Sequence, residues 1–215
     1  MIDNYKDLPL KKFLELRDID TEGMEDIDVQ VEIIAILADM PEEEVINLPL
    51  TEYKKMVSKT AFLATQPKEM KNPPKTIKVN GREYDVVSDV RNFTTGQYID
   101  YQSYIKDPEN LEKNFDKMMS IFLIPKGKKY GNGYDIAEVV KDALDISVET
   151  VIGLSRFFFQ QLQSSINNTL TYLEWMMKKL SRKEKNKEMK ERMEKAREEL
   201  LMLKSLVIDG DGYRG

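Results

Sequence analysis

The chain of 215 residues is 41% hydrophobic and 33% charged, with a formal net charge of −5 at pH 7. It contains no cysteine and no histidine, which excludes disulfides, thiol nucleophiles, Ser-His-Asp triads and most zinc sites. We therefore expect a helix-rich protein that is not an enzyme and that has no cofactor or metal site.

Residues 1–64 predict a small helical domain. Pro9 and Pro49 each stand where a helix can begin, because the fixed φ of proline suits the first turn and its missing N–H is not needed there. Residues 29–37 are apolar enough for a buried helix, although their β-branched side chains leave a strand open. Glutamates at positions 42–44 favour another short helix, since acidic side chains stabilise the positive end of the helix dipole.

Residues 65–75 are polar and proline-rich and predict a linker. The next segment, residues 76–87, places Asn80 and Gly81 between two alternating stretches, which is the strongest short-range signal for a β-hairpin with a type I′ turn. A lone hairpin is marginal in water. We therefore expect it to lie against the helices or to add strands from another subunit.

Residues 93–101 carry the signals of a helix start. Thr94 predicts the N-cap, and Gln97, three residues later, can close a capping box with it. Phe93 and Tyr98 have the spacing of a hydrophobic staple. The segment is therefore interpreted as a packing junction between the hairpin and the helices that follow.

A further helix is predicted from Asp107 until Pro125 ends it. Its buried stripe is expected to contain Leu111, Phe115, Met118, Met119 and Phe122. Residues 126–134 then form a basic, glycine-rich loop, and Asp135 with Glu138 predicts another capping box.

A long helical tract is predicted from about Ser147, with a bend at Asn167-Asn168 or at Ser181. One buried face is indicated by apolar residues every three or four positions, namely Leu154, Phe158, Leu162, Ile166, Leu170, Leu173, Met177 and Leu180. Farther on, a heptad seam predicts either a coiled coil or docking on the protein's own body, through Met189, Met193, Ala196, Leu200, Leu203 and Val207.

The predicted fold class is mainly α with one β-hairpin (α+β). We expect a small helical unit at the N-terminus, then the hairpin, then a helical bundle with a long C-terminal helix. The hairpin and the bundle form one domain of residues 76–208, and residues 209–215 are expected to be a flexible tail.

Charge is unevenly distributed along the chain. Residues 1–50 hold 14 Asp and Glu against 4 Lys and Arg, a net charge of −10. Residues 178–199 hold 10 Lys and Arg against 6 Glu, a net charge of +4. Such polarity can order assembly, because acidic and basic ends of neighbouring copies attract; two independently solvated surfaces remain the alternative.

Six aromatic residues are candidates for contacts with other proteins. Phe157, Phe158 and Phe159 cannot all face one side of a helix, so a wide core and a subunit interface both stay open. Tyrosines recur at every third residue from position 98, so that each points in a somewhat different direction around the helix. One of them is expected to face outward. The candidates are Tyr98, Tyr101, Tyr104, Phe157, Phe159 and Trp175.

Weaker candidates concern nucleic acid and calcium. Loop 126–134 offers positive charge and stacking rings through Lys126, Lys128, Lys129 and Tyr130. It lacks the Walker pattern, and an exposed loop is favoured over a nucleotide site. Residues 18–23 imitate the start of an EF-hand, but the twelfth position is Val29 instead of the bidentate Glu, so an acidic loop between helices is favoured over a calcium site.

Two stretches resemble a known class of proteins. Residues 28–64, with the apolar run 29–37 and then Leu48-Pro49-Leu50, resemble the helical front of tail assembly chaperones of tailed phages. The hairpin followed by residues 93–100 resembles virion-morphogenesis proteins of Bacteroidetes and crAss-like phages. The long C-terminal helix departs from the short chaperone pattern, which leaves room for a stable virion component.

The resemblance implies a non-enzymatic phage morphogenesis protein that binds tail or connector proteins during virion assembly. The alternatives are a structural virion component, such as a head-tail connector, ring or cargo protein, and a nucleic-acid-binding module. A homo-oligomer formed through the C-terminal helix stays open. No apolar run approaches the roughly 18 residues of a membrane span, and the N-terminus lacks a signal-peptide pattern. We expect the cytoplasm of the infected bacterium, with retention in the virion as the alternative.

Overall fold

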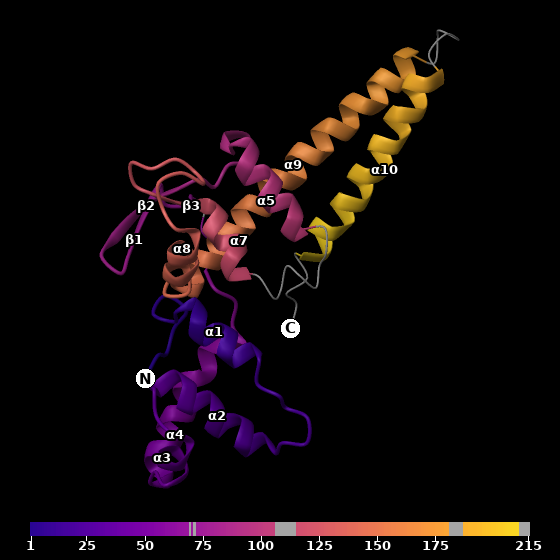
Figure 1. Ribbon diagram of the computed structural model, residues 1–215. Coiled ribbons are helices and arrows are strands. Elements are labelled where there is room, and N and C mark those ends of the chain that lie inside the picture. Colours follow the sequence, from indigo (N-terminus) through magenta and orange to yellow (C-terminus); the bar gives the residue numbers. More distant parts are fainter. Residues whose placement is uncertain (69, 71, 106–114, 181–186, 211–215) are drawn as a thin grey trace.

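The computed structural model describes residues 1–68, 70, 72–105, 115–180 and 187–210 (Figure 1). It consists of a helical unit at one end, a central body with a small sheet, and a long two-helix hairpin that projects from the body (Figure 1). The fold is mainly helical with an antiparallel sheet, which confirms the predicted fold class.

The N-terminal unit, residues 1–64, contains four α-helices and a 3-10 helix. Pro9 and Pro49, with φ of −66° and −54°, lie directly before two of the helices, as their fixed φ predicts. The elements are α1 (Leu10–Arg17), α2 (Asp26–Ala38), α3 (Glu42–Ile46), α4 (Leu50–Lys59) and η1 (Thr60–Ala64).

Helix α2 supplies the core of this unit. Val31, Ile34 and Ala35 are buried together with Val45 of α3. The run 29–37 is therefore a helix and not the strand that its β-branched residues left open, because its buried positions recur at helical spacing.

The hairpin is part of a three-stranded sheet. Strands β1 (Thr76–Val79) and β2 (Arg82–Val86) pair antiparallel across a turn at Asn80 and Gly81, whose φ angles of 49° and 76° are those of the predicted type I′ turn. Strand β3 (Leu123–Pro125) pairs with the other side of β2. The sequence did not predict β3, because its residues continue the apolar stripe of the preceding helix.

The body also contains helices that precede and follow β3 in the sequence. They are η2 (Val90–Asn92), α5 (Thr95–Ile105), α7 (Phe115–Phe122) and α8 (Ile136–Ala143). The predicted stripe of α7 is confirmed at Met118, Met119 and Phe122, which are buried in the main core with Tyr84 of β2. The predicted helix start at Asp107 lies outside the described residues.

The N-terminal unit is bonded directly to the body. The amides of Leu10 and Lys11 donate to the carbonyls of Ile146 and Leu144, both at 2.8 Å, and the amide of Val148 donates to Leu8 at 2.8 Å. Leu10 itself is buried in the main core. In the linker, Met70 lies directly over Gly153, so that a Cβ built on this glycine would be 2.6 Å from that of Met70.

Helices α9 (Val148–Leu180) and α10 (Lys187–Gly210) lie side by side and form the projecting hairpin (Figure 1). Helix α9 runs without interruption through Asn167 and Asn168, one of the two places at which a bend is predicted, and Ser181 lies outside the described residues. Of the predicted seam of α10, Leu200 packs against the main core, while Met189 is 50% exposed. Asp209 and Gly210 belong to α10, and the rest of the predicted tail is not described.

Candidate protein-interaction surfaces

Helix α5 begins with the predicted capping box. The amide of Thr94 donates to Gln97 Oε1 at 3.0 Å, and the amide of Gln97 donates to Thr94 Oγ1 at 3.2 Å. The Gln97 side chain, which is only 1% exposed, also donates from Nε2 to the carbonyl of Ile121 at 2.9 Å. One glutamine therefore closes the cap and ties α5 to α7.

The rings at the start of α5 are divided between the core and the surface. Phe93 packs against Tyr101 and Phe122, with ring centroids 6.3 Å and 5.8 Å apart. Tyr98, the staple partner that the sequence predicts for Phe93, is 46% exposed. Core packing thus takes Phe93 inward and leaves Tyr98 at the surface.

The three predicted tyrosines of α5 have three different environments. Tyr101 is fully buried, and Tyr104 packs partly against the same core. Burial raises the pKa of both hydroxyls. Tyr98 is therefore the outward tyrosine, and Ile99 beside it is 61% exposed. The exposed side of α5 therefore presents one aromatic and one aliphatic side chain.

Loop 126–134 packs against α5 through Tyr130, on the side of the helix that carries Gly96 and Asp100. Tyr130 donates its hydroxyl proton to Asp100 Oδ2 at 2.7 Å, and its ring lies 3.6 Å from where a Cβ of Gly96 would be. Burial, followed by this hydrogen bond, raises the pKa of Tyr130. The ring of Tyr130 is thus engaged within the protein, which does not favour its stacking on nucleic-acid bases.

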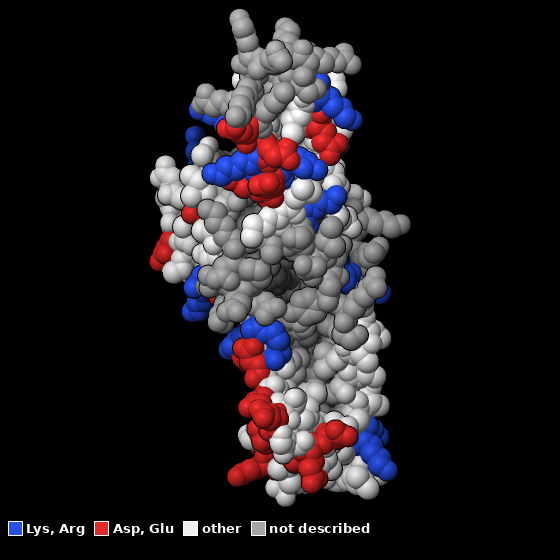
Figure 2. Space-filling view, turned by 90° about the vertical axis from the view of Figure 1, so that its right-hand side faces the viewer, with Lys and Arg blue, Asp and Glu red and all other residues white. Residues whose placement is uncertain are grey.

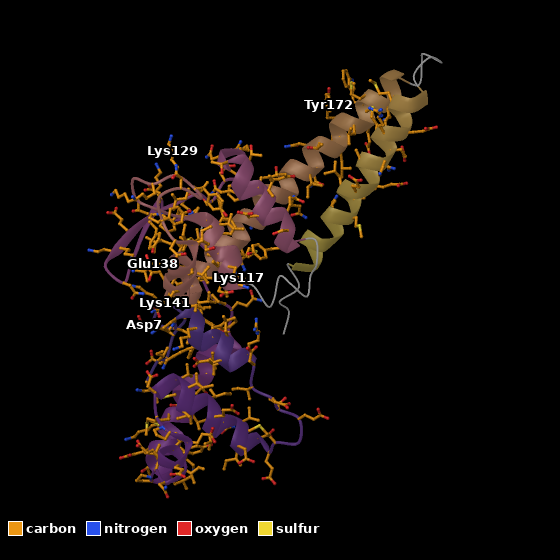
Figure 3. All side chains as sticks on the ribbon, in the orientation of Figure 1. Asp7, Lys117, Lys129, Glu138, Lys141 and Tyr172 are labelled. Carbon is orange, nitrogen blue, oxygen red and sulfur yellow. The ribbon has the colours of Figure 1, made fainter. Side chains whose placement is uncertain are left out.

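The lysines of the loop differ in their surroundings. Lys126 forms an ion pair with Glu83 of β2. Lys128 and Lys129 are exposed, and Figure 3 shows Lys129 at the edge of the loop. The loop therefore has exposed positive charge, but the ring of Tyr130, the candidate for stacking on bases, packs against α5.

A second exposed aromatic pair lies on the distal half of α9. Tyr172 is 57% and Trp175 is 53% exposed, and their ring centroids are 6.0 Å apart. Because residues on an α-helix are about 100° apart, this pair lies on the face opposite to the buried Ile166 and Leu170. Figure 3 shows Tyr172 on the side of α9 away from α10.

The remaining aromatic candidates lie where α9 crosses the body. Phe157 is half-buried, and the side chain of Phe159 lies outside the described residues. The sequence prediction named Trp175 but missed Tyr172 and Ile99. Tyr172 could have been found from its position three residues before Trp175, which puts both on one helical face.

A polar cluster centred on the buried Asp142 joins the hairpin to α8. Asp142, which is 3% exposed, accepts hydrogen bonds from Asn80 Nδ2 at 3.0 Å, from Arg82 Nη1 at 3.1 Å and from the hydroxyl of Tyr84. We call these four residues the Asp142 network. Nothing in the sequence predicts it, because α8 lies some 60 residues beyond the hairpin.

The protonation of the Asp142 network follows from its hydrogen bonds. Burial acts to raise the pKa of Asp142, but the bonds from Tyr84, Asn80 and Arg82 outweigh it and hold that pKa below its ordinary value. Burial and the bond to Asp142 raise the pKa of Tyr84 to about 12. Each member already bonds to another, so the network is suited to fixing the hairpin.

The start of α8 lies next to this network. Asp135 accepts a bond from the amide of Ala137 at 2.9 Å and caps the helix as predicted. Glu138, the predicted partner in a capping box, instead lies 3.5 Å from Arg82 Nη1. Figure 3 places Glu138 and Lys141 on the outer side of α8.

Among the residues that the structure describes, no group of three or more acidic side chains is arranged to hold a metal ion. Within the same ranges, no helix has both the length and the apolar character to cross a membrane. No family model, curated protein or solved structure matches the chain. Tyr98–Ile99 and Tyr172–Trp175 are two of the exposed apolar surfaces on the described residues, and both include aromatic residues of the kind enriched in protein interfaces.

Proposed function

We propose that this protein is a non-enzymatic phage morphogenesis protein that binds tail or connector proteins through the Tyr98–Ile99 surface of α5. The observation that carries the proposal is the exposure of these two apolar side chains on a helix that is otherwise well anchored. The resemblance of residues 28–64 and 76–100 to phage assembly proteins supports the class of partner.

The anchoring matters for binding. Gln97 bonds α5 to α7, Tyr101 is buried beneath it, and Asp100 holds Tyr130 of the loop. A surface that is already ordered loses less conformational entropy when a partner binds. Tyrosine is enriched in protein interfaces because its ring can be buried while its hydroxyl keeps a hydrogen bond.

The proposed mechanism is occlusion. The Tyr98–Ile99 surface covers an apolar region of a tail or connector protein until that protein assembles. The alternative is a structural virion component, and the projecting α9–α10 hairpin favours it, since a long rigid element suits a permanent position between other subunits. Mass spectrometry of mature particles separates the two, because a chaperone is absent or scarce there.

The experiment is cross-linking of the tagged protein during infection by the phage that encodes it. Tail or connector proteins are expected among the cross-linked products, identified by mass spectrometry. A variant with Tyr98→Ser and Ile99→Ser is expected to lose them. Met202→Ser is the matched control, because Met202 is 70% exposed but belongs to α10.

Two results would overturn this proposal. One is that no tail or connector protein is cross-linked to the wild-type protein. The other is that the α5 variant, with an unchanged circular dichroism spectrum, recovers the same proteins in the same yield as the Met202→Ser control.

A further inference from the structure

The turn of the β-hairpin is docked on the end of α8 through one side-chain amide. Asn80 Nδ2 donates to Asp142 Oδ1 at 3.0 Å and to Asp145 Oδ2 at 2.7 Å. Asp142 lies in α8, and Asp145 follows the end of that helix. Ionised carboxylates only accept hydrogen bonds, so this contact requires the NH₂ group of Asn80 as its donor.

The residue that follows Asn80 makes this amide chemically labile. Asparagine is a labile residue in proteins, and it loses its side-chain amide most readily before glycine. Gly81 has no side chain, so its backbone nitrogen can approach the side chain of Asn80 without obstruction. Asn80 is also exposed, so water reaches it. We propose that Asn80 is a site of spontaneous deamidation and that the reaction releases the hairpin turn from α8.

The reaction needs only the chain and water. The backbone nitrogen of Gly81 loses its proton to solvent and forms a bond to Cγ of Asn80. The bond between Cγ and Nδ2 breaks, so that ammonia leaves and a cyclic succinimide remains. Water then adds to one of the two ring carbonyls and opens the ring. The product is an aspartate, or an isoaspartate whose main chain passes through the side-chain carbon, and both carry a carboxylate in place of the amide.

The product cannot restore the contact with α8. The donor that served Asp142 and Asp145 is gone, and a third negative charge stands beside these two carboxylates. Like charges at hydrogen-bond distance disfavour each other strongly. Arg82 offsets part of this repulsion, but it is partly exposed and already bonded to Asp142 at 3.1 Å. The modified turn is therefore expected to leave the end of α8.

The docked contact also controls the rate of the reaction. Negative charge develops first on the nitrogen of Gly81 and then on the oxygen at Cγ of Asn80, and the carboxylates of Asp142 and Asp145 disfavour such charge. Both hydrogen bonds from Nδ2 must also break before ammonia leaves. The reaction therefore proceeds fastest from turns that have already moved away from α8, and it makes that opening permanent.

Two other asparagines of the chain serve as internal references. Asn132, before Gly133, forms the second Asn-Gly pair of the sequence; it is exposed, and within the described ranges no carboxylate bonds its side chain. Asn4 donates to two carboxylates, at 3.0 Å and 2.8 Å, but precedes Tyr5. It belongs to the N-terminal unit, and Figure 2 shows acidic residues gathered over this lower part of the molecule. Asn132 thus has the glycine without the carboxylates, and Asn4 has the carboxylates without the glycine.

The first test follows the three asparagines in the full-length protein during incubation in mildly alkaline buffer. Peptide mass spectrometry detects the exchange of NH₂ for OH at each position. Asn132 is expected to react first and Asn80 more slowly, while Asn4 stays intact over the same period. In urea above the unfolding midpoint, Asn80 and Asn132 are expected to react at similar rates, because only the local sequence then matters. In the folded protein, Asn80 reacting no faster than Asn4, or as fast as Asn132, overturns the proposal.

The second test loosens the docking. Asp145→Ala removes one charge and one acceptor at an exposed position but keeps Asp142. Deamidation at Asn80 is expected to become roughly 3–10-fold faster, since one hydrogen bond to a charged group is lost. The rate at Asn132 is expected to stay the same. An unchanged rate at Asn80, or an equal acceleration at both positions, refutes control by the docked contact.

The third test measures the release of the turn. Asn80→Asp reproduces the charge of the product, and Asn80→Gly is the matched control, because it removes the donor without adding charge and glycine readily adopts the φ of 49° found here. Hydrogen–deuterium exchange of residues 76–86 is expected to be faster in Asn80→Asp than in Asn80→Gly. Unchanged exchange in residues 1–64 verifies that both variants are folded. Equal exchange of residues 76–86 in the two variants contradicts release by the new charge.

This inference is independent of the proposed function, because the Tyr98–Ile99 surface takes no part in the reaction. The Tyr98→Ser and Ile99→Ser variant is accordingly expected to deamidate at Asn80 at the wild-type rate. Failure to bind tail or connector proteins and failure to deamidate at Asn80 are therefore separate results of separate experiments.

Discussion

Replacement of Asp142 by Asn removes the negative charge at the centre of the Asp142 network while keeping the shape of the side chain. Oδ1 accepts from Asn80, and Oδ2 accepts from Arg82 and Tyr84. In the variant, one of these oxygens becomes an NH₂ group that faces a donor. The Tyr84 hydroxyl can turn to accept, and the Asn80 amide can flip to present its oxygen at the cost of its present bonds, but the guanidinium of Arg82 has no acceptor.

The expected loss of stability follows from this geometry. Hydrogen bonds to a charged group contribute about 1.5–3 kcal/mol each, and breaking a buried ion pair costs about 3–5 kcal/mol. Because Arg82 is partly exposed and Asn keeps one acceptor, we expect Asp142→Asn to lower the free energy of unfolding by about 2–4 kcal/mol.

Urea unfolding followed by circular dichroism measures this loss. With a denaturant slope of about 2 kcal/mol/M, the midpoint is expected to fall by about 1–2 M. Asp145→Asn is the matched control, because exposed Asp145 also accepts from Asn80 Nδ2, at 2.7 Å. Its expected loss is below about 1 kcal/mol. The reasoning fails if both variants lose the same stability or if Asp142→Asn unfolds at the wild-type midpoint.

The dependence on pH gives a further check. The pKa of Asp142 lies below its ordinary value of 3.8 in the folded protein. Its stabilisation is therefore fully present above that ordinary value and is lost as the pH falls through the folded pKa. The difference between the wild type and Asp142→Asn should accordingly shrink below about pH 4. A difference that stays constant down to pH 2 contradicts this.

Four other substitutions have defined expectations. Gly153→Ala should lower the free energy of unfolding by about 1–3 kcal/mol in the urea assay, because its new Cβ would meet Met70. Gly96→Ala is the comparison, because the nearest neighbour of its new Cβ would be 3.6 Å away. It should be neutral or stabilising by up to about 1 kcal/mol. Thr94→Ala should cost about 1 kcal/mol through the lost cap, and a loss below the error of the urea midpoint would contradict that role. Because the pKa of Tyr84 rises from 10.0 to about 12 on folding, stability should fall between pH 10 and 12, and less steeply in Tyr84→Phe.

The parts of this fold that the sequence predicted depend on residues close together in the chain. The Asn80-Gly81 turn and the box between Thr94 and Gln97 need only the preferences of neighbouring residues, and both are confirmed. The same holds for the helix starts after Pro9 and Pro49. Local chemistry alone decides these features.

What the sequence did not predict depends on distant partners. Strand β3 exists because β2 offers it an edge, and Leu123 otherwise continues the stripe of α7. Which tyrosine of α5 faces outward depends on where α7 and loop 126–134 lie. Tyr98 and Tyr101 have the same local pattern, but only Tyr101 meets the core.

The backbone bonds between residues 8–11 and 144–148 affect how the chain is synthesised. A ribosome must make about two thirds of the protein before the amide of Leu10 can reach the carbonyl of Ile146. Until then Leu10, which is buried in the main core of the finished protein, lacks those partners. Folding from such long-range contacts is slow, and exposed apolar surface invites aggregation meanwhile. The N-terminal unit is thus made first, but it gains its backbone bonds to the body only after residues 144–148 have been made.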